Sequence, residues 1–151
     1  MDRIDVQDYM SRYCESPYPM IFINNRSLDL ILCEYFNDEY LYGLVPSVTW
    51  LWDEEEQKLA IERFVNEISD STFVPLLICP DDADFSCTVI IVEVEFSDDY
   101  VVWKRFGLDI SDPILGICTT VKWLEPSLNF KFDKIKYREF KNSLLKILQA
   151  I

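Results

Sequence analysis

The side chains in this sequence that could do chemistry are carboxylates and thiols, because the chain contains no histidine. This absence removes Ser-His-Asp and Cys-His catalysis, histidine general bases and histidine metal ligands. No GxGxxG, Walker A or GxSxG motif occurs either. With 27 acidic residues, neighbouring carboxylates are too common to indicate an acid–base pair. We therefore expect no enzymatic activity, no catalytic residue and no cofactor.

The thiols do not form a recognisable motif. The five cysteines are Cys14, Cys33, Cys79, Cys87 and Cys118. Their number is odd and no two have Cys-x-x-Cys spacing, which favours neither a disulfide framework nor a zinc site built on thiolate pairs. Lys104 and Arg105 could lower the pKa of a nearby thiol, but no cysteine adjoins them in sequence. We interpret the cysteines as free thiols in a reducing compartment.

The most concentrated group of carboxylates outside a predicted helix is Asp81-Asp82-Ala83-Asp84. Clustered carboxylates are the ligands that Ca²⁺ and Mg²⁺ prefer. The segment lacks the Asp/Asn spacing and the central glycine of an EF-hand loop. We therefore expect a solvated loop and no metal site.

A second candidate segment combines aromatic and acidic residues, Trp50-Leu51-Trp52 followed by Asp53-Glu54-Glu55-Glu56. If residues 47–52 form a strand, Trp50 and Trp52 share one face of it. That face could belong to the core, or it could be a protein-binding patch, since aromatic side chains anchor interfaces and charge steers encounter. The candidate partner-binding residues are Trp50, Trp52, Glu54, Glu55, Asp81, Asp82, Asp84, Asp98 and Asp99.

The elements that must position these residues indicate an α+β fold, with a mostly antiparallel sheet, in one domain of residues 1–151. Helices are expected at 53–69, capped by Asp53, and at 133–150, capped by Asp133 with Phe132 packed on Tyr137. A third, short helix is expected within 4–14. Alternating β-branched and aromatic residues predict a strand over 47–52.

The strongest β pattern predicts a central hairpin of residues 88–96 and 100–106, with Asp98 and Asp99 in its turn. The apolar and charged positions select one register, because a shift by one residue would place a carboxylate beside a tryptophan. The pairs expected in this register are Phe96 with Val101, Val94 with Trp103, and Glu93 with Lys104.

The net charge of −13 constrains the choice of partners. It argues against direct binding to nucleic acid, where a basic surface is expected, and against an anionic membrane. A basic protein is the complementary partner, although acidity also serves solubility. Residues 131–146 carry six basic and two acidic residues, a local net charge of +4. This last helix is either a solvated face or a surface for self-association with the acidic body.

The N-terminal residues lack an apolar signal core, and the longest apolar runs are far too short to span a bilayer. We therefore expect a cytoplasmic protein.

Three segments carry a resemblance to a known class of proteins: Val101–Asp109 (VVWKRFGLD), Val121–Pro126 (VKWLEP) and Phe130–Asp133 (FKFD), the last leading to Tyr137. Together with the size and acidity, they resemble the immunity proteins of bacterial toxin–immunity systems, including contact-dependent growth inhibition and other polymorphic toxins. The resemblance implies an antitoxin that binds one cognate toxin domain, often a basic nuclease, and occludes its active site or an adjacent surface. Contact residues in such proteins differ from pair to pair, so none is transferred here. The alternative is an acidic DNA mimic or adaptor that sequesters a nucleic-acid-binding protein.

Overall fold

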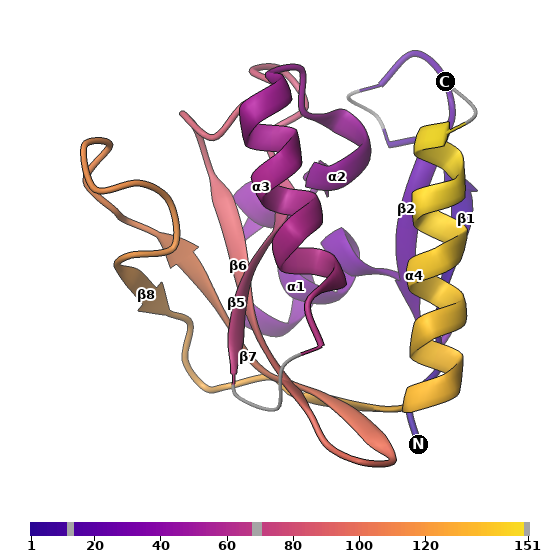
Figure 1. Ribbon diagram of the computed structural model, residues 1–151. Helices are drawn as coiled ribbons and strands as arrows, with labels where there is room; N and C mark the ends of the chain where they lie inside the picture. Colours follow the sequence, from indigo (N-terminus) through magenta and orange to yellow (C-terminus); the bar gives the residue numbers. More distant parts are fainter. Residues whose placement is uncertain (12–13, 68–70, 150–151) are drawn as a thin grey trace.

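The computed structural model describes residues 1–11, 14–67 and 71–149. The α+β fold class predicted from the sequence is confirmed, with antiparallel sheets and helices packed against them (Figure 1). The strands are β1 (Ile4–Tyr9), β2 (Tyr18–Ile23), β3 (Arg26–Ser27), β4 (Val45–Pro46), β5 (Thr72–Ile78), β6 (Val89–Phe96), β7 (Tyr100–Asp109), β8 (Val121–Trp123) and β9 (Phe130–Asp133). The helices are α1 (Leu28–Phe36), the 3₁₀ turn η1 (Glu39–Leu41), α2 (Ser47–Trp50), α3 (Glu54–Val65) and α4 (Lys134–Gln149).

The strands form a small sheet and a larger one. The small sheet has the order β1-β2-β3, and the larger has the order β4-β5-β6-β7-β8, with β9 paired to β7. Helix α3 packs on β5 of the larger sheet, whereas α4 packs on β1 and on the end of the larger sheet (Figure 1). The N-terminal segment links the two sheets, since the backbone N–H of Asp2 donates to the carbonyl of Lys131 in β9 (2.9 Å).

The central hairpin is formed by β6 and β7, as predicted, and two of its three expected pairs are confirmed. Phe96 lies opposite Val101, and Val94 lies opposite Trp103. The third expected pair, Glu93 with Lys104, is wrong, since a bulge places Arg105 opposite Glu93. A bulge inserts one extra residue into one strand. Both basic residues still serve the carboxylates of β6: Arg105 donates to Glu93 at 2.7 Å, and Lys104 lies 3.2 Å from Glu95.

Helix α3 begins as predicted and ends earlier than predicted. The Asp53 carboxylate accepts the N–H of Glu56 (2.9 Å), which caps the first turn. The helix ends at Val65, four residues before the expected end at 69, and Asn66 has extended backbone. Residues 68 and 69 lie outside the described chain.

Helix α4 follows the sequence prediction closely, over Lys134–Gln149. The Asp133 carboxylate accepts the N–H of Lys136 (3.0 Å), and the Phe132 and Tyr137 rings stack with their centroids 5.7 Å apart. Residue 150 lies outside the described chain. Tyr137 also accepts a hydrogen bond from the indole of Trp103 (3.1 Å), and both side chains are buried where α4 meets β7 and β9.

Two shorter elements differ from the sequence predictions. The helix expected within 4–14 is instead strand β1, because residues 4–9 pair with β2 along their whole length. The strand expected over 47–52 is instead the single turn of α2, in which the N–H of Leu51 donates to the carbonyl of Ser47 (3.0 Å). The Ser47 hydroxyl, which donates to the Pro75 carbonyl of β5, holds this turn against the sheet. In both places tertiary contacts outweigh weak local propensity.

Candidate functional site

An open hollow of about 590 Å³ lies where α2 meets the loop between β5 and β6. It is lined by Thr49, Trp50, Trp52, Pro80, Asp81, Asp82 and Ala83. Among these described lining residues there are two carboxylates and no basic side chain. The hollow therefore combines aromatic surface with negative charge, which suits a cationic group carried on an apolar surface.

Hydrogen bonds hold both walls of the hollow in place. The Trp50 indole donates to the Pro80 carbonyl (2.9 Å), and the backbone N–H of Trp52 donates to the Ala83 carbonyl (3.1 Å). On the far side of the loop, the Glu56 carboxylate accepts the N–H of Phe85 (3.3 Å). The acidic loop is thus tied to α2 and to the start of α3.

The two tryptophans have different environments. Trp50 is half-buried, and its ring packs edge-on against Tyr18 with the centroids 5.4 Å apart. Trp52 is 87% exposed. The strand that would have placed them on one face of a sheet is absent, because the chain makes a helical turn at 47–50. Of the two tryptophans, Trp52 therefore offers the large exposed aromatic surface to a partner.

The structure brings together most of the predicted partner-binding residues. Trp50, Trp52, Asp81 and Asp82 line the hollow, and the exposed Glu54 and Glu55 lie close by in sequence, in the first turn of α3 after the capping Asp53. We call Trp52, Glu54, Glu55, Asp81 and Asp82 the acid–aromatic patch. Asp84 lies further along the same loop, where hydrogen bonds from Ser86 lower the pKa of its carboxyl.

Asp98 and Asp99 do not belong to this group. They occupy the turn between β6 and β7, at the end of the molecule opposite α2 (Figure 1). The Asp99 carbonyl accepts the N–H of Lys134 at the start of α4 (3.0 Å). A partner covering the hollow would leave this turn outside the interface, so the nine predicted residues cannot form one continuous site.

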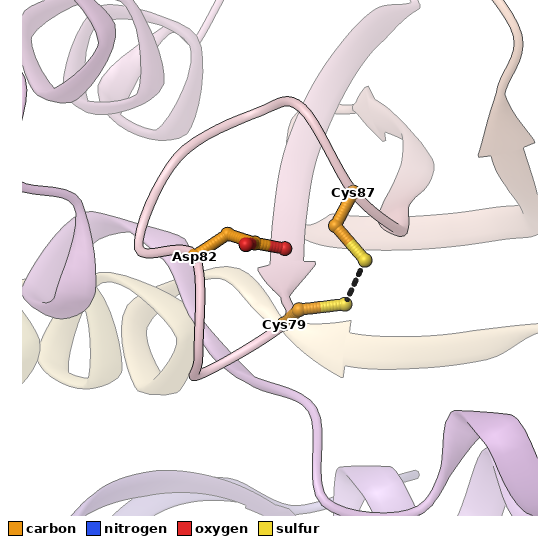
Figure 2. Close-up of side chains that lie close together, drawn as sticks. All are labelled: Cys79, Asp82 and Cys87. Atoms are coloured by element: carbon orange, nitrogen blue, oxygen red, sulfur yellow. Dashed lines mark hydrogen bonds between the residues drawn. The ribbon is translucent and has the colours of Figure 1, made fainter.

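One arrangement beside the hollow was not predicted from the sequence. Cys79 and Cys87 lie at the two ends of the acidic loop, and their side chains point toward each other (Figure 2). The Cys79 and Cys87 sulfur atoms lie 2.7 Å apart, and a carboxylate oxygen of Asp82 lies within 4.8 Å of both sulfurs. Burial raises the pKa of the Cys79 thiol, and the neighbouring Cys87 thiol raises it further. The sequence pattern that could have predicted this approach is a pair of cysteines flanking a loop between two strands. Because these strands pair, with Ile78 opposite Val89, the two cysteines are brought together.

The basic residues of α4 serve mainly to hold the fold together. Arg138 and Lys141 both contact the carboxylate of Glu67, each with an N–O distance of 2.6 Å. Lys134 donates to the carbonyl of Ser97 (2.9 Å). The positive face, for which the sequence left open a solvated role or self-association, therefore has much of its charge engaged within the chain.

A separate exposed apolar feature, in the loop between β7 and β8, was not predicted from the sequence. Ile114 is 92% exposed in the loop between β7 and β8, which projects from the body of the molecule (Figure 1). Leu115 beside it is also exposed, and its N–H donates to the carbonyl of Asp112 (2.9 Å).

Neither family models, nor curated proteins, nor solved structures provide a match to this chain. In the part of the chain that the structure describes, no helix combines the length and apolar character needed to cross a membrane.

Proposed function

We propose that this chain is an immunity protein that binds a basic toxin domain, such as a nuclease, and neutralises it by covering its active site or an adjacent surface. The observation that carries the proposal is the 87% exposure of Trp52 beside a hollow that contains Asp81 and Asp82. Tryptophan is among the residues that contribute most to binding energy when an interface buries them. An exposed tryptophan on a fixed backbone is therefore suited to anchor a partner.

The two components of the acid–aromatic patch have different roles. Trp52 supplies contact area, and the hydrogen bond of its backbone N–H to the Ala83 carbonyl fixes the backbone that carries the indole. The carboxylates of Glu54, Glu55, Asp81 and Asp82 attract a cationic surface and accelerate encounter. A nuclease has such a surface because it binds phosphates.

The overall charge supports the same partner. A net charge of −13 adds long-range attraction toward a basic protein. A nuclease toxin acts on nucleic acid in the cytoplasm, so a protein that neutralises it there would have the cytoplasmic location that the sequence predicted. It does not require the last helix to contact the partner.

The first experiment identifies the partner through the reading frames next to this gene. A neighbouring frame that encodes a large protein with a basic C-terminal domain supplies the candidate toxin. We expect that domain to co-purify with this chain and to lose its activity in the complex. Displacement of several unrelated DNA-binding proteins, with no single cognate partner, would support the DNA-mimic alternative instead.

The second experiment tests the surface. We expect Trp52→Ala to weaken the complex by about 30-fold or more, since truncating an aromatic anchor costs about 2 kcal/mol or more. Ile114→Ala is the matched control, because it removes an exposed apolar side chain from a different loop. An unchanged affinity for Trp52→Ala, or a larger loss for Ile114→Ala, would place the interface elsewhere.

The third experiment separates steering from general acidity. Asp81→Asn combined with Glu54→Gln should lower the association rate constant and its dependence on salt. Asp98→Asn combined with Asp99→Asn removes the same charge from the opposite end of the molecule and should have a smaller effect. Equal effects of the two pairs would mean that only net charge matters.

A further inference from the structure

We propose that Cys79, Cys87 and Asp82 form a binding site for a thiophilic divalent cation, with Zn²⁺ the ion that best fits the donor set. Two sulfur atoms and a carboxylate oxygen, from both ends and the middle of one loop, lie within 4.8 Å of one another (Figure 2). Zn²⁺ takes thiolate and carboxylate ligands, and sites with three protein ligands complete their tetrahedron with water. This inference does not depend on the identity of any protein partner.

The convergence of the carboxylate on the thiols is the feature that points to a metal ion. A bond between the two sulfurs would make no use of Asp82. Ionisation of both thiols beside Asp82 would place three negative charges within 4.8 Å of one another, and a divalent cation would compensate two of them.

Strand pairing and hydrogen bonds fix the backbone around the three donor residues. Strand pairing next to the thiols sets Ile78 opposite Val89, and the loop is tied to α2 through Trp50 and Trp52. Two sulfurs bound to one tetrahedral zinc ion lie about 3.8 Å apart. The present sulfur–sulfur distance is 2.7 Å, so binding requires the thiols to separate by roughly 1 Å. The exposed Cys87 can provide this change by rotation of its side chain.

A bound ion would close the loop at both ends and at Asp82. The same loop supplies Asp81 and Asp82 to the hollow, so the ion would hold one wall of it. The charge of the wall would also change, because Asp82 would become a ligand.

The test uses the full chain, reduced with a phosphine that does not chelate metals. Zn²⁺ affinity is measured by competition with a chromophoric chelator, and Cd²⁺ is added separately to read the ultraviolet charge-transfer band of cadmium thiolates. We expect one ion per chain and a thiolate band. Cys79→Ser and Cys87→Ser should each abolish the band and weaken Zn²⁺ binding by about 100-fold or more, and Asp82→Ala by about tenfold. Cys33→Ser, which removes a half-buried thiol on α1, is the matched control and should change neither.

A second measurement on the unmodified chain guards against serine variants that do not fold. Stoichiometric Zn²⁺ should protect Cys79 and Cys87 from alkylation, as read by peptide mass spectrometry, and leave Cys33 as reactive as before. Protection at other cysteines, an unchanged affinity in the Cys79→Ser and Cys87→Ser double variant, or the absence of a cadmium thiolate band would each overturn the proposal. A chain that forms a Cys79–Cys87 disulfide and, once reduced, binds no Zn²⁺ would also overturn it.

Discussion

The carboxylate of Glu67 connects the segment that follows α3 to helix α4. It accepts hydrogen bonds from the Arg138 guanidinium at 2.6 and 3.0 Å and from the Lys141 ammonium at 2.6 Å. The Lys141 side chain is only 5% exposed, and its ammonium lies 5.1 Å from the centre of the Phe96 ring. Glu67→Gln removes the charge and leaves a buried cation without its counter-ion, which is among the more damaging changes a fold can receive.

The magnitude follows from the pKa of this carboxyl group. The hydrogen bonds from Arg138 and Lys141 hold the pKa of Glu67 at about 2, compared with an ordinary value of 4.5. A difference of this size corresponds to about 3 kcal/mol of stability at neutral pH. Since Glu67 is 29% exposed and Arg138 is half-exposed, solvent screening reduces the figure to roughly 2 kcal/mol.

The sign of the pH dependence is set by the direction of the shift. Because the folded-state pKa is depressed, the stabilisation is fully present above pH 4.5 and is lost as the pH falls toward 2. Urea unfolding of the wild type and Glu67→Gln at pH 7 should therefore differ by roughly 2 kcal/mol, and the difference should shrink below pH 4.5. Glu139→Gln is the control, since Glu139 pairs with Lys136 where both side chains are well exposed. A loss no greater than that of the control, or a difference that stays constant down to pH 3, would refute the reasoning.

Three further changes test other parts of the fold. Asp29 is fully buried, and burial raises the pKa of its carboxyl above the ordinary value of 3.8. The stability of the wild type should therefore fall as the pH rises above 3.8 through the folded-state pKa, and Asp29→Asn should gain stability relative to the wild type over that rise in urea titrations. Gly107→Ala should cost about 2 kcal/mol by chemical denaturation, because the added methyl group would meet atoms of β8 at 2.4 and 2.9 Å. Trp103→Phe should cost about 3 kcal/mol in the same assay, because it opens a cavity and leaves the buried Tyr137 hydroxyl without its indole donor.

The parts of the fold that the sequence predicted well are those in which local and long-range signals agree. Helix α4 combines a capping aspartate, Asp133, an aromatic contact from Phe132 to Tyr137, and a sustained apolar stripe. The β6–β7 hairpin combines alternation with opposite charges on facing strands. The one error in its register is the bulge that places Arg105 opposite Glu93. A bulge depends on where one residue leaves the ladder, which an alternating pattern does not show.

The elements that the sequence mispredicted are short and depend on distant segments. Residues 4–9 form a strand because β2 lies beside them, and residues 47–50 form a helical turn because Ser47 bonds to Pro75, 28 residues away. These wrong predictions of secondary structure also affected the prediction of the candidate site. The half-burial of Trp50 and the exposure of Trp52 follow from that turn, and the approach of Cys79 to Cys87 follows from the pairing of β5 with β6.

The acidity of the chain is not in itself a binding site, because many of its carboxylates perform structural tasks. Asp53 and Asp133 cap helices, Asp109 accepts the N–H of Cys118 (3.0 Å), and Glu67 and Glu93 neutralise basic side chains. The carboxylates at the hollow differ because they stand beside an exposed tryptophan on a loop that hydrogen bonds already hold. These carboxylates can attract a cationic partner to the hollow, and the complex that then forms buries Trp52. Affinity should therefore depend on Trp52 more than on any single carboxylate, whereas the association rate should show the opposite order.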